Sequence, residues 1–217
     1  MSIKNNQIYI DRYERFFHSY KTIYNLDPWY DIKFNEALWK IDSFFSKNNI
    51  LGNILEIGVF RGLSFIPLRM LLKDTEEAVA VDIFDKYYNH ELDDEIFKNN
   101  VISIFDNLDH IHIIKDSTKN LDKKNFALKN ELQYRIISVD GGHMYDDVIT
   151  DLTLAKDILH KDGVVIIDDY LNSSWPEVKI GVDDFLKKNE DIRTHRQYLH
   201  HNKLLLTFNK SVINKYI

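Results

Sequence analysis

The chain has 217 residues, a length typical of one domain, and its 44% hydrophobic and 29% charged residues are close to globular averages. Its formal net charge of −6 offers no basic field for a nucleic-acid backbone, and the absence of cysteine excludes disulfides, zinc–thiolate sites and thiol nucleophiles. No signal-peptide pattern and no apolar run of roughly 18 residues is present. We therefore expect a cytoplasmic, single-domain protein over residues 1–217, with no membrane span and no nucleic-acid partner.

The first fifty residues show helical patterns. Aromatic side chains recur at helical spacing at Tyr13, Phe16, Phe17, Tyr20 and Tyr24. The Asp27-Pro28-Trp29 sequence breaks this helix, and a second one follows with Phe34, Leu38, Ile41 and Phe45 on one face. Residues 1–50 could form a lid over a ligand or a homo-oligomer surface, and plain packing against the rest of the chain is the alternative.

From residue 53 onward, short apolar strands alternate with helices. The predicted parallel strands are 54–57, 78–81, 111–114, 136–139 and 164–167, and two final strands, 196–199 and 203–208, form a hairpin. Helices are predicted over 65–72, 95–105 and 182–187, and a further one carries Val148 to Leu159 and ends near Gly163, its expected C-cap. Continuous apolar strands indicate a parallel sheet covered on both faces.

We therefore predict an α/β fold with N-terminal helices. Its Rossmann-like core, residues 53–208, would be a mostly parallel seven-stranded sheet with an antiparallel C-terminal hairpin. Acidic residues follow four successive strands: Asp82, Asp116, Asp140 and Asp168-Asp169. Because open α/β sheets bind ligands beyond the carboxyl ends of their strands, we expect the functional site at this edge.

The segment from Glu56 to Gly62 joins the first strand to a helix. Gly58 permits a tight turn and Gly62 permits close backbone approach, although an ordinary strand-to-helix turn is the alternative. Asp82 closes the next strand about 20 residues later, where a carboxylate can accept hydrogen bonds from ribose hydroxyls. Phe60 replaces the middle glycine of a dinucleotide loop, and the Glu56 carboxylate suits an ammonium better than a phosphate. These features favour S-adenosylmethionine.

The run LEIGVFRGLS, residues 55–64, resembles the first motif of class I S-adenosylmethionine-dependent methyltransferases, in a branch that accepts a bulky residue at the middle-glycine position. The resemblance extends from about residue 54 to residue 208. It implies contacts to the methionine part from Glu56, Gly58, Gly62 and Ser64, to the ribose from Asp82, and to the adenine from Asp116 and Ser117. A helix cap is the alternative role for Asp116 and Ser117.

The residues Asp140, Asp168 and Asp169 are expected to converge, because neighbouring strands lie about 4.8 Å apart. Clustered carboxylates repel one another unless a cation neutralises them. Oxygen ligands favour a hard ion, Mg²⁺ by preference, with Mn²⁺ or Ca²⁺ as alternatives. Capping of loops or helices is the alternative role for one or two of these acids.

His143 is the candidate general base. It follows Asp140 by three residues, at an expected helix start where the dipole favours a neutral imidazole that can accept a hydroxyl proton. The alternative is a solvent-facing or capping histidine. Residues 87–90 and Trp175-Pro176 follow strand ends and are candidates for a substrate wall or for loop anchoring.

These segments together resemble the metal-dependent O-methyltransferases that act on sugars, the macrocin and mycinose type. The resemblance implies that Asp140, Asp168 and Asp169 hold Mg²⁺. It also implies that His143 is the base, since Gly142 replaces the aspartate that other members use. The implied reaction methylates a hydroxyl of a sugar in a glycan or glycosylated metabolite. The alternatives are a catechol-like or nitrogen acceptor, a non-catalytic S-adenosylmethionine-binding regulatory protein and a nicotinamide-dependent dehydrogenase, which the glycine pattern disfavours.

Overall fold

The structure, a computed structural model, describes residue 14 and residues 34–85, 94–193, 196–198, 202–209 and 211. The predicted aromatic stripe from Tyr13 to Tyr24, the break at residues 27–29 and the candidate substrate-wall residues 87–90 lie outside the described residues. No helix among those described is both long enough and apolar enough to cross a membrane.

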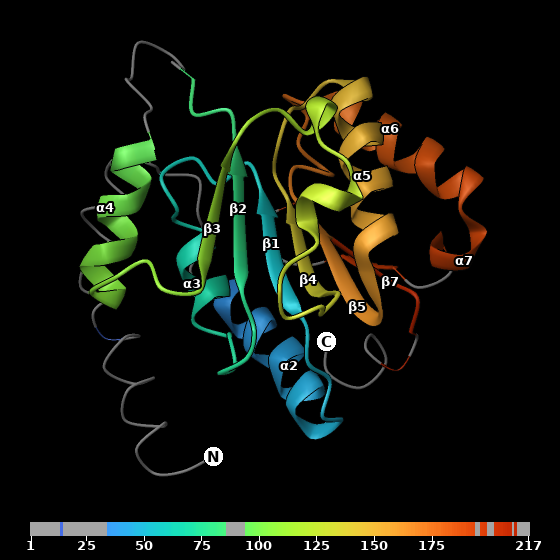
Figure 1. Cartoon of the computed structure of the whole chain (residues 1–217). Helices are drawn as coiled ribbons and strands as arrows, with labels where there is room; N and C mark the ends of the chain where they lie inside the picture. Colours follow the sequence, from blue (N-terminus) through green and yellow to red (C-terminus); the bar gives the residue numbers. More distant parts are fainter. Residues whose placement is uncertain are drawn as a thin grey trace.

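Strands and helices alternate along most of the chain (Figure 1). The first half contains α2 (Phe34–Lys47), β1 (Asn53–Ile57), α3 (Phe65–Arg69), β2 (Ala78–Asp82), α4 (Asp94–Phe105) and β3 (Ile111–Lys115). Two short 3-10 helices follow, η1 (Thr118–Asn120) and η2 (Lys123–Phe126). The second half contains β4 (Tyr134–Val139), α5 (Tyr145–Ile158), β5 (Leu159–Ile167), α6 (Pro176–Lys188), α7 (Glu190–Arg193), β6 (Arg196–Tyr198) and β7 (Leu204–Thr207).

The strands form one sheet in the order β3-β2-β1-β4-β5-β7-β6. The strands β1 to β5 pair in parallel, whereas β7 runs antiparallel to both β5 and β6. The chain moves outward from β1 to β3 and then returns to β4, so β1 and β4 are neighbours at the switch point where such sheets bind ligands. The predicted α/β fold, with a mostly parallel sheet and antiparallel C-terminal strands, is confirmed.

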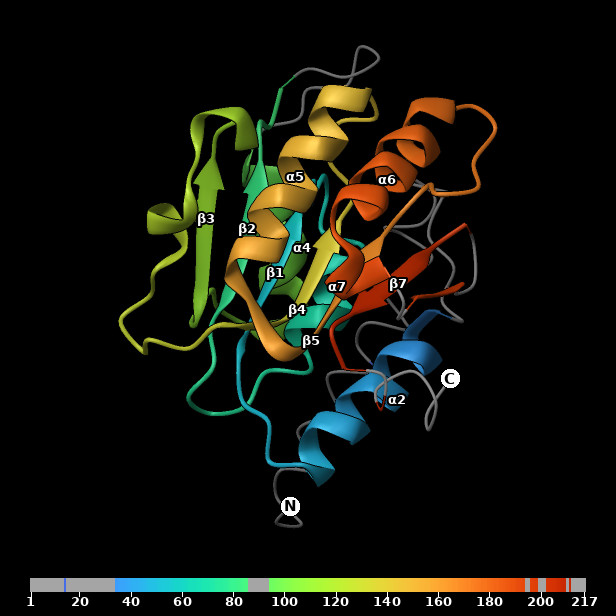
Figure 2. The ribbon, with the colours of Figure 1, turned by 90° about the vertical axis from the view of Figure 1, so that its right-hand side faces the viewer.

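Helices cover both faces of the sheet, with α2, α3 and α4 on one side and α5 and α6 on the other (Figures 1 and 2). Side chains alternate along each strand, so Ile54 packs in the core on the α2 side, while Leu55 and Ile57 pack in the core on the α5 side. Burial on both faces explains why the strands are continuous apolar runs. The predicted apolar face of α2 is buried, including Leu38 and Ile41.

The prediction that Gly163 caps a helix is wrong. Helix α5 ends at Ile158, and β5 begins at once with Leu159, so Gly163 lies inside the strand. Its carbonyl oxygen accepts a hydrogen bond of 2.7 Å from the Thr207 hydroxyl of β7. A Cβ atom at this position would lie 2.9 Å from the Tyr134 carbonyl oxygen. The glycine therefore permits close packing of neighbouring strands.

A buried ionic network ties α2 to the amino ends of the strands. The Arg135 side chain is fully buried and donates from Nε to Glu76 Oε1 and from Nη2 to Glu76 Oε2, both at 2.8 Å. Its Nη1 donates to Asp42 Oδ1 of α2 at 3.1 Å. This network lies at the edge opposite the acidic strand ends, so it stabilises the fold without reaching the predicted site.

Candidate active site

The carboxyl ends of the central strands are joined by backbone hydrogen bonds. The Asp140 amide donates to the Ile57 carbonyl at 2.8 Å, and the Asp168 amide donates to the Val139 carbonyl at 2.9 Å. These bonds bring the first residues after β1, β4 and β5 to one place, as the sequence predicted.

Gly58 brings the loop after β1 into direct contact with the end of β4. It has a left-handed backbone, with φ of +82°, and a Cβ atom would lie 1.9 Å from the Asp140 carbonyl oxygen. Every residue other than glycine would collide with this backbone atom. The predicted cofactor loop and the predicted catalytic edge are therefore in contact.

Asp82 binds the backbone of two turns at this edge of the sheet, one after β1 and one after β2. Its Oδ2 accepts from the Phe60 amide at 2.7 Å and its Oδ1 accepts from the Phe84 amide at 2.8 Å. Both phenylalanines have a φ of +46°, so Phe60 adopts the left-handed backbone that a glycine would otherwise supply. Each carboxylate oxygen keeps a further lone pair, and ribose binding by Asp82 stays a prediction.

Glu56 is a buried carboxyl group with an unused oxygen. Its side chain is inaccessible to solvent, Oε1 accepts from the Ser138 hydroxyl at 3.1 Å, and Oε2 has no hydrogen-bond partner among the described residues. Burial raises the pKa of Glu56 to about 8, against the opposing effect of a hydrogen bond from Ser64. A ligand ammonium would satisfy Oε2 and favour the ionised form, so this residue fits the cofactor that the sequence predicted.

Asp116 and Ser117, the predicted adenine contacts, lie at the N-terminal cap of η1. Asp116 Oδ1 accepts from the Ser117 amide at 2.7 Å and from Asn120 Nδ2 at 2.8 Å. The Ser117 hydroxyl accepts from the Lys119 amide at 3.3 Å at the start of η1. Asp116 and Ser117 therefore make capping contacts, the alternative role, and their contact with an adenine ring stays a prediction.

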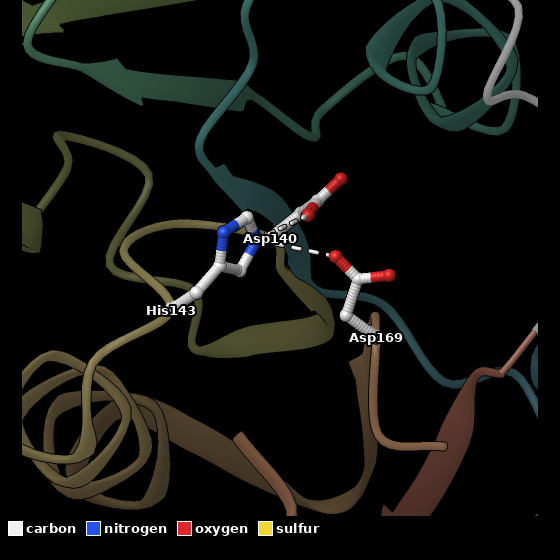
Figure 3. A group of neighbouring side chains, drawn as sticks. All are labelled: Asp140, His143 and Asp169. Carbon is white, nitrogen blue, oxygen red and sulfur yellow. Dashed lines mark ion pairs between the residues drawn. The ribbon is translucent and has the colours of Figure 1, made fainter. Parts of the chain in front are cut away.

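Asp140, His143 and Asp169 form a compact cluster of potential metal ligands (Figure 3). One ligand atom from each residue lies within 4.8 Å of the others. The imidazole points toward both carboxylates, with Nε2 at 3.2 Å from Asp169 Oδ2 and 3.9 Å from Asp140 Oδ1. Asp169 reaches this position through a left-handed backbone with φ of +56°.

The expected helix-start position of His143 is wrong. Helix α5 begins at Tyr145, with Met144 as its N-cap, so His143 lies in the preceding loop. Partial burial lowers the pKa of His143, but Asp140 and Asp169 outweigh this effect and raise it to about 9. The neighbouring carboxylates therefore favour an imidazolium, where the helix dipole had led us to expect a neutral ring.

The surroundings of this cluster fit a divalent cation. Desolvation, followed by repulsion from Asp168, raises the pKa of Asp140 to about 7. His143 Nε2 is buried. Within the described part of the chain no neighbour meets the geometry of a hydrogen bond to it, although Asp169 Oδ2 lies 3.2 Å away. The imidazole stacks on Trp175, with ring centroids 4.4 Å apart and planes inclined by 24°. A cation between the carboxylates would relieve their repulsion, and Asp140 and Asp169 offer the hard oxygen atoms that Mg²⁺ or Mn²⁺ prefers.

Asp168, the third predicted ligand, turns toward Lys203. The two side chains form an ion pair, and Asp168 Oδ1 also accepts from the Asp169 amide at 2.8 Å. Sequence reasoning missed Lys203, which it placed in a terminal hairpin. The run of leucines that follows, 204–206, was the signal that this strand enters the core. The structure thus gathers Asp140 and Asp169 with His143, and places Asp168 against a buried lysine.

This fold, with the Gly58 turn, Asp82 and the acidic strand ends gathered at one edge of the sheet, is that of a class I S-adenosylmethionine-dependent methyltransferase. A family model described as a methyltransferase domain (Methyltransf_24) matches residues 55–170, more than half of the chain. The chain belongs to this methyltransferase family, and the predicted enzyme class is confirmed. A search of curated proteins found no significant match.

Many solved structures share the fold, among them the following three. The O-methyltransferase NovP aligns with a TM-score of 0.65 and 20% identity, over 81% of this chain and 79% of that one. CalS11, a TDP-rhamnose 3'-O-methyltransferase of calicheamicin biosynthesis, aligns with a TM-score of 0.59 and 15% identity over 96% of each chain. An O-methyltransferase from Bacillus cereus, in complex with SAH, aligns with a TM-score of 0.62 and 15% identity, over 91% of this chain and 96% of that one.

Proposed function

We propose that this protein transfers the methyl group of S-adenosylmethionine to a hydroxyl of a sugar, in a glycan or a glycosylated metabolite, with a divalent cation at the site. The contact between Gly58 and Asp140 carries the proposal, because it joins the predicted cofactor loop to the cluster of Asp140, His143 and Asp169. The sugar acceptor is supported by the shared fold of CalS11, which is described as acting on TDP-rhamnose.

Glu56 and Asp82 would hold the cofactor. The unused Oε2 of Glu56 would accept from the methionine ammonium, and the resulting ion pair would keep Glu56 ionised. Asp82 would accept from the ribose hydroxyls with the lone pairs that Phe60 and Phe84 leave free. Together these contacts would fix the methyl group at the carboxyl edge of β1 and β4.

Asp140 and Asp169 would hold the cation, Mg²⁺ or Mn²⁺. A bound divalent cation supplies an anchor for acceptor oxygens and lowers the pKa of a hydroxyl. With the cation bound, the charges of Asp140 and Asp169 would be compensated and would no longer raise the pKa of His143, so that partial burial would favour the neutral imidazole.

His143 would act as the general base. As the acceptor oxygen forms its bond to the methyl carbon, the carbon–sulfur bond breaks and its electron pair stays on sulfur, which yields S-adenosylhomocysteine. The hydroxyl proton passes to Nε2, the nitrogen that faces both carboxylates. Stacking against Trp175 would keep the ring in this orientation.

Methyl transfer from radiolabelled S-adenosylmethionine tests this function directly. The acceptors would be nucleotide sugars, free glycosides, catechols and amines, with and without Mg²⁺. We expect labelled sugar ethers, and a loss of about 100-fold in His143→Gln. The exposed His112 of β3 gives a matched control, since His112→Gln should retain full activity. Full activity of His143→Gln, or labelling of amines alone, would contradict the proposal.

A phenolic acceptor is the second candidate, favoured by two exposed apolar side chains in the chain segments that carry His143 and Asp169. Met144 follows His143 and is 56% exposed, and Leu171 lies two residues after Asp169 and is 51% exposed. Exposed apolar side chains pack against an aromatic ring better than against an unsubstituted, polar sugar. Preferred labelling of the catechols in the same panel would support this alternative.

A further inference from the structure

Lys203 is a buried cation in the wall of the site. It directly precedes β7, and because Leu204 pairs with Ile167 of β5, Lys203 lies opposite Asp168. Its side chain is 9% exposed, it pairs with Asp168, and its Nζ lies 5.0 Å from the centre of the Phe34 ring. A lysine is almost never buried to this extent unless its charge is compensated, so Asp168 is an essential partner.

Asp168 and Asp169, the two consecutive acids after β5, contact different neighbours. Asp168 Oδ2 faces Lys203, and Asp168 Oδ1 accepts from the Asp169 amide. Asp169 Oδ1 accepts from Asn172 Nδ2 at 2.8 Å, which leaves Oδ2 directed at His143. One oxygen of Asp168 is therefore bound to Lys203 and the other to the Asp169 amide, whereas Asp169 Oδ2 faces His143 at the centre of the site.

We propose that Lys203 is a positioning residue that keeps Asp168 from coordinating the cation, so that Asp140 and Asp169 are the carboxylate ligands. The inference rests on the proposed function, because it requires a divalent cation at this edge. The charges support it: Lys203 pairs with Asp168, while its charge also acts on Asp140 and Glu56, and Asp140 and Asp169 together balance a doubly charged ion. Direct coordination by Asp168 would instead take away the carboxylate partner of a buried ammonium.

A charge-balanced double substitution separates the two roles of Asp168. In Asp168→Asn/Lys203→Met the pair is replaced by neutral groups of similar size, so no buried charge is left unpaired. Mn²⁺ binding would be measured by electron paramagnetic resonance on the full chain saturated with S-adenosylhomocysteine. We expect the double variant to bind Mn²⁺ within about threefold of the unsubstituted chain, and Asp169→Asn to bind at least about tenfold more weakly.

The single variant Asp168→Asn should bind Mn²⁺ more weakly than the double variant, because it leaves the Lys203 charge uncompensated near the ion. The exposed pair of Lys187 and Asp184 on α6 provides the matched control, since Lys187→Met/Asp184→Asn should not change Mn²⁺ binding. Circular dichroism would establish that each variant is folded.

A loss of about tenfold or more in the double variant would overturn the proposal and identify Asp168 as a ligand. Failure of the unsubstituted chain to bind Mn²⁺ would overturn both this proposal and the metal part of the proposed function. Should the double variant not fold, a crystal of the unsubstituted chain with Mn²⁺ and S-adenosylhomocysteine decides the question. Anomalous scattering should then place the ion against Asp140 and Asp169, and an ion on Asp168 would overturn the proposal.

Discussion

Gly58 and Asp140 are in backbone contact, and a side chain at position 58 would lie 1.9 Å from the Asp140 carbonyl oxygen. Gly58→Ala should therefore displace the cofactor loop from the end of β4. We expect the free energy of unfolding to fall by about 2 kcal/mol or more, since strain and collision act together. Binding of S-adenosylhomocysteine, measured by calorimetry, should be lost at the same time. An alanine variant with unchanged binding would show that this contact does not shape the cofactor site.

The Arg135 network should control stability without controlling cofactor binding. Arg135→Met leaves the buried Glu76 carboxylate without its guanidinium partner, and we expect a loss of about 3–5 kcal/mol in denaturant unfolding. Arg135→Met/Glu76→Gln should recover part of that loss, because the uncompensated charge is then gone. If the single and double variants were equally unstable, the loss would come from packing and not from charge.

Asp151 should make the stability of the protein depend on pH. This residue of α5 is 1% exposed and accepts a hydrogen bond of 2.5 Å from the Thr118 hydroxyl. Burial raises the pKa of Asp151 from 3.8 to about 7. Between these values the folded state keeps a proton that the unfolded state has lost. The stabilisation is therefore complete below pH 3.8 and is lost as the pH rises through 7.

The variant Asp151→Asn should remove this dependence. Relative to the unsubstituted chain, it should gain about 2 kcal/mol in unfolding free energy on going from pH 5 to pH 8. Urea unfolding at the two pH values provides the measurement. Asp157→Asn, at an exposed position of the same helix, is the matched control and should show no such gain. Equal pH profiles for Asp151→Asn and the unsubstituted chain would refute the assignment.

Trp175 should act through His143. Removal of the stacked ring in Trp175→Leu should lower kcat for methyl transfer by about tenfold or more and change KM much less, because the imidazole loses its fixed orientation. Trp175→Phe keeps a stacking surface and should restore most of the activity. A change in KM alone would instead mark Trp175 as part of the acceptor-binding wall.

The sequence predicted the location of the site because the topology of a parallel sheet determines it. Short apolar strands that each end in an acid, such as those before Asp82 and Asp140, must place those acids at one edge. Gly58 was recognisable for a similar reason, since a strand-to-helix turn beside another backbone leaves no room for a Cβ atom. Gly62, in the same loop, has a left-handed backbone with φ of +86° and lies against the Phe97 ring. Local patterns were sufficient for these features.

Features that depend on distant segments were not predictable in this way. The burial of Lys203 requires both the pairing of β7 with β5 and the approach of Phe34 from α2. The charge of His143 depends on Asp169, which follows a different strand. Gly163 resembled a helix cap because a helical stripe precedes it, whereas the close approach of the Tyr134 carbonyl oxygen of β4 explains why a glycine stands there.

Calorimetric titration with S-adenosylmethionine and, separately, with NAD tests the cofactor assignment most directly. The unsubstituted chain should bind S-adenosylmethionine and not NAD. Glu56→Gln, which keeps the shape of the buried side chain but cannot carry a charge, should weaken S-adenosylmethionine binding by about tenfold or more. Binding of NAD without binding of S-adenosylmethionine would contradict the assignment of this site to methyl transfer.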